Sequence, residues 1–192
     1  MVIINRETKE TKIHLELDMH SGPSVSTNTG LPFFDHMLNA MAFHGGFTLN
    51  VEARGDIEVD PHHLIEDTGL VLGDALLKTF EQTGALVRYG HAVIPMDDAL
   101  SEVTIDVCRR PFLVLNADWP QMSAGNFDFF LIKEFLQALA NRGGLNIHAS
   151  CRYGENSHHM SEALFKALGR GLYTAFRPLS GDSREMSTKG LI

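Results

Sequence analysis

The chain has 192 residues, of which 44% are hydrophobic and 21% are charged, a composition typical of a globular protein and not of a disordered one. Its formal net charge of −8 argues against general nucleic-acid binding, which needs a basic surface to neutralise phosphates. No apolar stretch approaches the ~20 residues that span a bilayer, and no signal-peptide pattern opens the chain. We therefore expect a cytoplasmic protein without a membrane partner, in which Cys108 and Cys151 are reduced thiols.

The first half of the chain alternates extended and helical patterns. Apolar residues at every second position predict a strand over 13–17, which Gly22-Pro23 ends. The later patterns predict a helix that follows Pro32 and stops at Gly45-Gly46, and a strand over 47–53. A turn at Gly55-Asp56, an extended continuation at Ile57 and Val59, and a helix from His62 to about Phe80 follow.

The second half follows the same order of elements. Three strands are predicted over 92–95, 103–107 and 112–116. A helix from Phe127 to about Asn141, a strand over 145–147, a turn at Tyr153-Gly154 and a helix from His158 to Phe176 follow.

One sequence string occurs twice at an offset of half the chain length. His62-His63-Leu64-Ile65-Glu66 returns 96 residues later as His158-His159-Met160-Ser161-Glu162. At the same offset Leu49, Asn50, Val51, Leu72, Gly73, Leu76 and Phe80 pair with Leu145, Asn146, Ile147, Leu168, Gly169, Leu172 and Phe176. The pattern predicts a single domain over 1–192, built of two fused βαβ-type repeats of about 1–90 and 91–192. The expected fold class is α+β, with helices packed on a mostly antiparallel sheet.

The two histidines of each doublet point in different directions on a helix. Successive residues step by ~100°, so His62 lies ~40° from Glu66 but ~100° from His63. Each doublet therefore predicts ligands for two different metal ions, in sites shared between the two halves or between neighbouring subunits. Imidazole and carboxylate without thiolate favour Mn, Fe, Zn or Co.

Another histidine supplies a further candidate ligand. If the first helices of the two repeats are aligned with a two-residue shift, His36 lies opposite Glu134. Glu134 is then a candidate ligand in the second half, although a solvated helix residue is the alternative. We interpret His14, His20 and His91 as structural and leave His148 unassigned.

These motifs together resemble the imidazoleglycerol-phosphate dehydratase family. The resemblance runs from about Arg6 to Lys189 and rests on Phe33-Phe34-Asp35-His36-Met37-Leu38, Asp60-Pro61-His62-His63-Leu64-Ile65-Glu66-Asp67, Asp97-Asp98-Ala99-Leu100, residues 154–167 and Ser187-Thr188-Lys189-Gly190. It implies a duplicated fold of the ribosomal-S5-domain-2-like kind and a 24-subunit homo-oligomer. It also implies two Mn²⁺ ions per active site, at subunit interfaces. The implied metal ligands are His36, His62, His63, Glu66, His158, His159 and Glu162, and some members have histidine at the place of Glu134.

The reaction implied is the dehydration of D-erythro-imidazole glycerol phosphate to imidazole acetol phosphate, a carbon–oxygen hydro-lyase step of L-histidine biosynthesis. The hydrogen that is lost lies on a carbon without an adjacent carbonyl, so the imidazole ring has to act as the electron sink. Two metal ions, one on each ring nitrogen, would hold the ring as an imidazolate that expels the hydroxyl group.

The resemblance also assigns catalytic and substrate-binding residues. Glu10 is the implied general acid/base, with Glu66, Glu162 and Asp97 as the other catalytic candidates. Arginine and lysine suit a phosphate group, and Arg109 competes with Arg110 for that role. The expected substrate-binding residues are Glu10, His36, His44, Arg88, Arg110, Lys166, Ser187, Thr188 and Lys189.

Two other classes of function are open from the residues alone. A dinuclear hydrolase or phosphatase would use the same ligands to activate water, and a metal-storage or metal-sensing protein would use them without catalysis. Metal identity, the subunit that supplies each ligand and the role of Glu134 are not fixed by the sequence.

Overall fold

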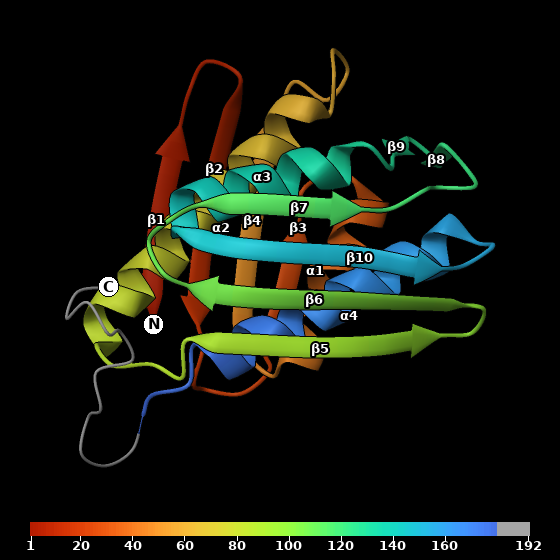
Figure 1. The fold of residues 1–192 in the computed structure, drawn as a ribbon. Coiled ribbons are helices and arrows are strands. Elements are labelled where there is room, and N and C mark those ends of the chain that lie inside the picture. The colour runs from red at the N-terminus through yellow and green to blue at the C-terminus, as the bar shows by residue number, and fades with distance from the viewer. Residues whose placement is uncertain (180–192) are drawn as a thin grey trace.

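The computed structural model describes residues 1–179, in which two four-stranded sheets enclose four helices (Figure 1). The first half forms β1 (Val2–Glu7), β2 (Thr11–Asp18), β3 (Val25–Asn28), α1 (Pro32–Gly45), β4 (Thr48–Gly55) and α2 (His62–Thr83). The second half forms β5 (Tyr89–Met96), β6 (Ala99–Val107), β7 (Phe112–Asn116), α3 (Leu131–Gly143), β10 (Leu145–Tyr153) and α4 (Ser157–Ala175). A short hairpin, β8 (Ser123–Ala124) and β9 (Phe127–Asp128), precedes α3.

The two halves share one topology. The first sheet has the strand order β1-β2-β4-β3 and the second has the order β5-β6-β10-β7. In each sheet the last pair is parallel, β3 with β4 and β7 with β10, and the other pairs are antiparallel. The sequence repeat is therefore also a repeat of structure, and the fold is α+β with two sheets where the sequence suggested one.

The helices lie between the sheets, so each sheet buries one face and exposes the other (Figure 1). In β2, Ile13, Leu15 and Leu17 are buried, whereas His14 and Glu16 between them are partly exposed. This alternation is the pattern of a sheet with one face covered. α2 packs on β1 and β2, and α4 packs on β5 and β6.

Glycines allow the helices of the two halves to approach closely. A Cβ atom on Gly169 of α4 would lie 1.9 Å from the carbonyl oxygen of Met41 in α1 and 3.2 Å from the nitrogen of Gly45. Its counterpart Gly73 in α2 would meet the backbone of Gly143 in α3 at 2.8 Å. α1 therefore packs against α4 as α3 packs against α2.

These contacts explain the two-residue shift between the first helices. Gly46 ends α1 and Gly144 ends α3, both in the left-handed conformation, at an offset of 98. The first half has two extra residues, Phe47 and Thr48, before the strand residue Leu49, which restores the offset of 96. His36 and Glu134 are thus structurally equivalent positions on α1 and α3.

Two local predictions are wrong. Ile57 and Val59 do not extend β4 but lie in a turn that the Val59 N–H closes on the carbonyl of Asp56 at 2.8 Å. Phe127 does not begin a helix, because α3 begins at Leu131. The buried Phe127 ring packs instead on Phe33 with a centroid distance of 5.0 Å, and this tertiary contact outweighs the local helical pattern.

No helix within residues 1–179 combines the length and the apolar character that crossing a membrane requires. Cys108 and Cys151 are both free thiols.

Candidate metal centre

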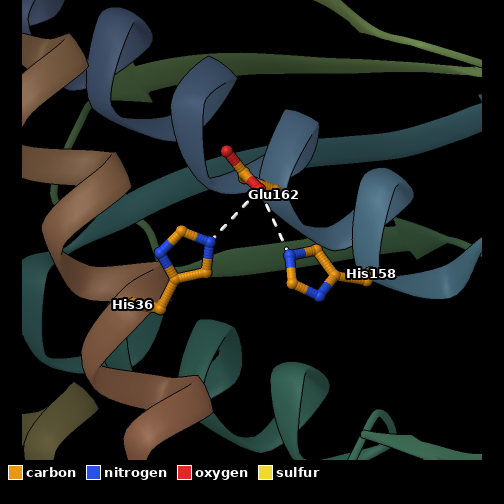
Figure 2. A group of neighbouring side chains, drawn as sticks. All are labelled: His36, His158 and Glu162. Atoms are coloured by element: carbon orange, nitrogen blue, oxygen red, sulfur yellow. Dashed lines mark hydrogen bonds and ion pairs between the residues drawn. The ribbon is translucent and has the colours of Figure 1, made fainter.

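α1 and α4 bring together three metal-ligand side chains, His36, His158 and Glu162 (Figure 2). The Nε2 atoms of His36 and His158 lie 3.2 and 3.3 Å from the same oxygen, Oε2 of Glu162. One ligand atom from each residue falls within 4.8 Å of the other two. Residues 126 positions apart in the sequence thus form one cluster.

The N-terminal turns that carry the doublets are held in the same way in both halves. The N–H of His158 donates to Oδ1 of Asn156 at 2.9 Å, and the N–H of His62 donates to Oδ1 of Asp60 at 2.9 Å. Asp60 and Asn156 are again 96 residues apart. Each bond gives a partner to a backbone N–H in the first turn of its helix that has none within the helix; Asn156 is the N-cap of α4, whereas Asp60 precedes Pro61, the N-cap of α2.

Glu162 is the most buried member of the cluster, with 8% of its surface exposed. Burial opposes its ionisation, but hydrogen bonds from Lys166 and His36 lower the pKa of the carboxyl group below its ordinary value. The Nζ atom of Lys166 lies 2.7 Å from Oε1 of Glu162.

A pocket of about 460 Å³ adjoins the cluster and is lined in part by His36, His44 and Glu162. Partial burial and the charge of Lys166 lower the pKa of His44.

The first doublet shows half of an equivalent arrangement. Nε2 of His62 lies 3.2 Å from Oε2 of Glu66, as His158 does from Glu162. Glu134 occupies the place of His36, is half-buried, and makes no side-chain hydrogen bond or ion pair within the described residues. No group of three ligands is formed by the first doublet among residues 1–179.

The two histidine rings of each doublet are nearly perpendicular, with interplanar angles of 73° and 78° and centroids 6.2 and 6.1 Å apart, and the second ring bonds to a different acid from the first. Nδ1 of His63 lies 3.2 Å from Asp56, and Nδ1 of His159 lies 2.5 Å from Asp98. Each hydrogen bond raises the pKa of its histidine. The sequence patterns assign no role to Asp56 or Asp98, although Asp98 lies in one of the motifs that carry the family resemblance.

The two acid/base candidates lie near these second histidines. Oε2 of Glu10, in the turn between β1 and β2, is 4.0 Å from Nδ1 of His63. Oδ2 of Asp97, in the turn between β5 and β6, is 3.7 Å from Nε2 of His159, and its backbone has φ 46°. Both side chains are more than half exposed and are available to a bound molecule.

Within residues 1–179, the expected phosphate-binding residues Arg88 and Arg110 are not members of the cluster. The Nε of Arg88 donates to Oδ1 of Asp106 at 2.7 Å, and the guanidinium lies over the Tyr89 ring. Arg110 is exposed after β6. Ser187, Thr188 and Lys189 lie outside the described residues.

The histidines interpreted as structural have contacts away from the cluster. His14 pairs with Asn5 at 2.7 Å, and His91 pairs with Glu102 at 2.9 Å. The backbone N–H of His20 donates to Asp18, and His148 is exposed on β10.

Comparison with known proteins identifies the family of the chain. Residues 29–172 match the family described as imidazoleglycerol-phosphate dehydratase. The imidazoleglycerol-phosphate dehydratase of Trichlorobacter lovleyi is 48% identical over 189 residues, which cover 98% of this chain and 97% of that one. The protein of the same name from Lacticaseibacillus casei is 44% identical, with the same coverage.

Two solved structures with this name have the same fold. The enzyme from Pyrococcus furiosus, solved in complex with (S)-C348, has a TM-score of 0.85 and 37% identity, covering 98% of this chain and 100% of that chain. The enzyme from Staphylococcus aureus has a TM-score of 0.82 and 36% identity, covering 93% of this chain and 100% of that chain. The chain therefore belongs to the imidazoleglycerol-phosphate dehydratase family and is a hydro-lyase of histidine biosynthesis.

Proposed function

We propose that this cytoplasmic enzyme dehydrates D-erythro-imidazole glycerol phosphate with two Mn²⁺ ions per active site, in a homo-oligomer of 24 subunits. The observation that carries the proposal is the cluster of His36, His158 and Glu162, together with its equivalent positions in the other half of the chain. The family of the chain supports the substrate in this proposal, and the residues of the cluster and of its equivalent positions support the metal sites.

The donor set of the cluster fits a divalent transition-metal ion. Two imidazole nitrogens and one carboxylate oxygen within 4.8 Å of one another can move onto a common ion with small side-chain adjustments. The ionised state of Glu162, which Lys166 and His36 favour, is the state that binds metal. Bound metal ions would act as Lewis acids that draw electron density from the imidazole ring of the substrate.

The internal symmetry of the fold predicts the second set of ligands. The relation that takes His158 and Glu162 to His62 and Glu66 takes His36 to Glu134. Glu134 then supplies a carboxylate where the first cluster has an imidazole. Two carboxylates repel each other without a cation between them, which agrees with the absence of contacts at Glu134 within the described residues.

The directions of His63 and His159 support a site shared between subunits. Three ligands from one chain do not complete a metal shell, and neither second histidine belongs to a group of three ligands within residues 1–179. A neighbouring copy whose second histidine reaches the cluster would complete each site. Metal binding and assembly would then depend on each other.

Other residues of the chain would bind the substrate and move its protons. Glu10 is an exposed carboxylate 4.0 Å from His63, which suits a general acid/base close to a metal ligand. His44 lines the pocket beside Glu162, and Lys166 bonds to Glu162, so both would contact a substrate bound there. Arg88 and Arg110, together with Ser187, Thr188 and Lys189, are the proposed partners of the phosphate group.

The test is a dehydration assay on imidazole glycerol phosphate in deuterated water, with metal analysis of the same sample. The proposal predicts imidazole acetol phosphate with deuterium on carbon, two Mn²⁺ per chain, and loss of activity after chelation that Mn²⁺ restores. Release of inorganic phosphate without carbon-bound deuterium would instead identify a phosphatase. Stoichiometric metal without turnover would identify a metal-binding protein.

A further inference from the structure

Each second histidine of the doublets has a carboxylate on its Nδ1 atom. Both oxygens of Asp56 lie near Nδ1 of His63, at 3.2 and 3.3 Å, and Oδ1 of Asp98 lies 2.5 Å from Nδ1 of His159. A carboxylate at this position accepts the Nδ1–H, so the lone pair of the ring is on Nε2. The first histidines of the doublets differ, because their Nε2 atoms face a glutamate.

The duplication does not explain these two carboxylates. The position 96 residues after Asp56 is Arg152, and the position 96 residues before Asp98 is Val2. Asp56 lies between β4 and α2, whereas Asp98 lies between β5 and β6. The two repeats therefore reach the same arrangement from different parts of the fold, which points to a shared functional requirement and not to common descent of the pair.

The neighbouring acids do not take over this role. Glu10 is 4.0 Å from Nδ1 of His63, and Asp97 is 3.7 Å from Nε2 of His159, both beyond hydrogen-bond distance. Asp98 is further fixed because its Oδ2 accepts the N–H groups of Glu155 and Asn156 at 2.5 and 3.0 Å. The hydrogen bonds from His159 and Glu155 lower the pKa of Asp98 well below its ordinary value.

We infer that Asp56 and Asp98 are positioning residues that hold His63 and His159 in the tautomer and direction in which Nε2 binds a metal ion of a neighbouring subunit. This inference rests on the proposed function, because it needs His63 and His159 to be ligands. Carboxylates behind ligand histidines commonly contribute about 10- to 100-fold to metal affinity.

Asp56 offers the cleaner test, because its side chain bonds only to His63 among the contacts of residues 1–179. The protein would be titrated with Mn²⁺, and free Mn²⁺ would be measured by electron paramagnetic resonance. We expect Asp56→Ala to weaken binding at one site about 10- to 100-fold. Asp56→Asn keeps an oxygen acceptor for Nδ1–H and should recover most of the affinity.

The control is Glu102→Gln, which removes a carboxylate from His91 on the outer face of the second sheet, where Nε2 lies 2.9 Å from it. This variant should bind Mn²⁺ as the wild type does. Unchanged affinity in Asp56→Ala, or equal weakening in Asp56→Ala and Asp56→Asn, would overturn the inference. If Asp56→Ala does not fold, Asp56→Asn against wild type decides it, because a loss above tenfold rejects positioning by an accepted hydrogen bond. Wild-type protein that binds no Mn²⁺ would instead reject the proposed function.

Discussion

Gly169→Ala tests whether the contact between α1 and α4 builds the metal cluster. The added Cβ would lie 1.9 Å from the carbonyl oxygen of Met41, so the two helix backbones must separate by about 1.5 Å to reach an ordinary contact. The cluster spans the same two helices, with His36 on one and Glu162 on the other. Stability and metal binding should therefore both decrease.

The magnitude follows from two opposing effects. Overpacking a close-packed contact costs about 1–3 kcal/mol, and rigid backbone on both sides places Gly169 at the upper end. In the opposite direction, the higher helix propensity of alanine relative to glycine adds about 1 kcal/mol to the free energy of unfolding. We expect a net loss of about 2 kcal/mol in the free energy of unfolding, or about 4–8 °C in melting temperature for a chain of this size. Mn²⁺ affinity should decrease about tenfold, as for lost ligand positioning.

Two other glycines calibrate the assay. Gly171→Ala, in the same helix, places its Cβ 3.2 Å from the flexible Cδ1 of Ile105, and it should be neutral or slightly stabilising. The Cβ added by Gly73→Ala would lie 2.7 Å or more from the atoms of α3, and its loss of stability should fall between those of Gly169→Ala and Gly171→Ala. Chemical denaturation of the metal-free proteins at equal chain concentration, with Mn²⁺ titration in parallel, measures both effects. The reasoning would be refuted if the Gly169→Ala protein had the same free energy of unfolding and the same Mn²⁺ affinity as the Gly171→Ala protein.

Three further predictions concern single residues. Glu134→Ala should reduce bound Mn²⁺ from two ions per chain to about one, whereas Glu134→His should retain both ions. Metal analysis after gel filtration measures the number of bound ions. Two ions in the alanine variant would exclude Glu134 as a ligand. Glu10→Gln should keep metal and assembly but lower kcat by about 10²–10⁴-fold, and wild-type turnover in the dehydration assay would remove Glu10 from the acid/base role. Burial raises the pKa of the Cys151 thiol to about 11. Iodoacetamide at pH 8 should therefore alkylate Cys151 on the order of a hundredfold more slowly in the folded than in the unfolded protein, and equal rates by mass spectrometry would contradict that burial.

The sequence predicted best those features that depend on neighbouring residues. Pro32 and Gly45 bound α1 as expected, because proline suits the first helical turn and a glycine pair ends the helix. β1 was not predicted, because its three apolar residues are consecutive and do not alternate with polar ones, and the strand forms by pairing with β2. Phe127 was assigned to the wrong element, because its packing partner Phe33 is remote in the sequence.

The same distinction applies to the site. The doublets and His36 could be found because they form strings of ligand-type residues at helical spacing. Asp56 and Asp98 could not, because only the folded turns bring them to the histidines. The contact between His36 and Glu162 likewise depends on the packing of α1 on α4, which no local pattern encodes.

The two equivalent ligand sets differ in charge, because one contains Glu134 where the other contains His36. The described cluster has two imidazoles and one carboxylate, whereas its equivalent has one imidazole and two carboxylates. The second set therefore carries one more negative charge and should hold a divalent ion more tightly. An imidazole ring with one substituted carbon also has two inequivalent nitrogens. Two unequal sites can fix which nitrogen meets which ion, and hence on which side of the ring the phosphate-bearing chain lies.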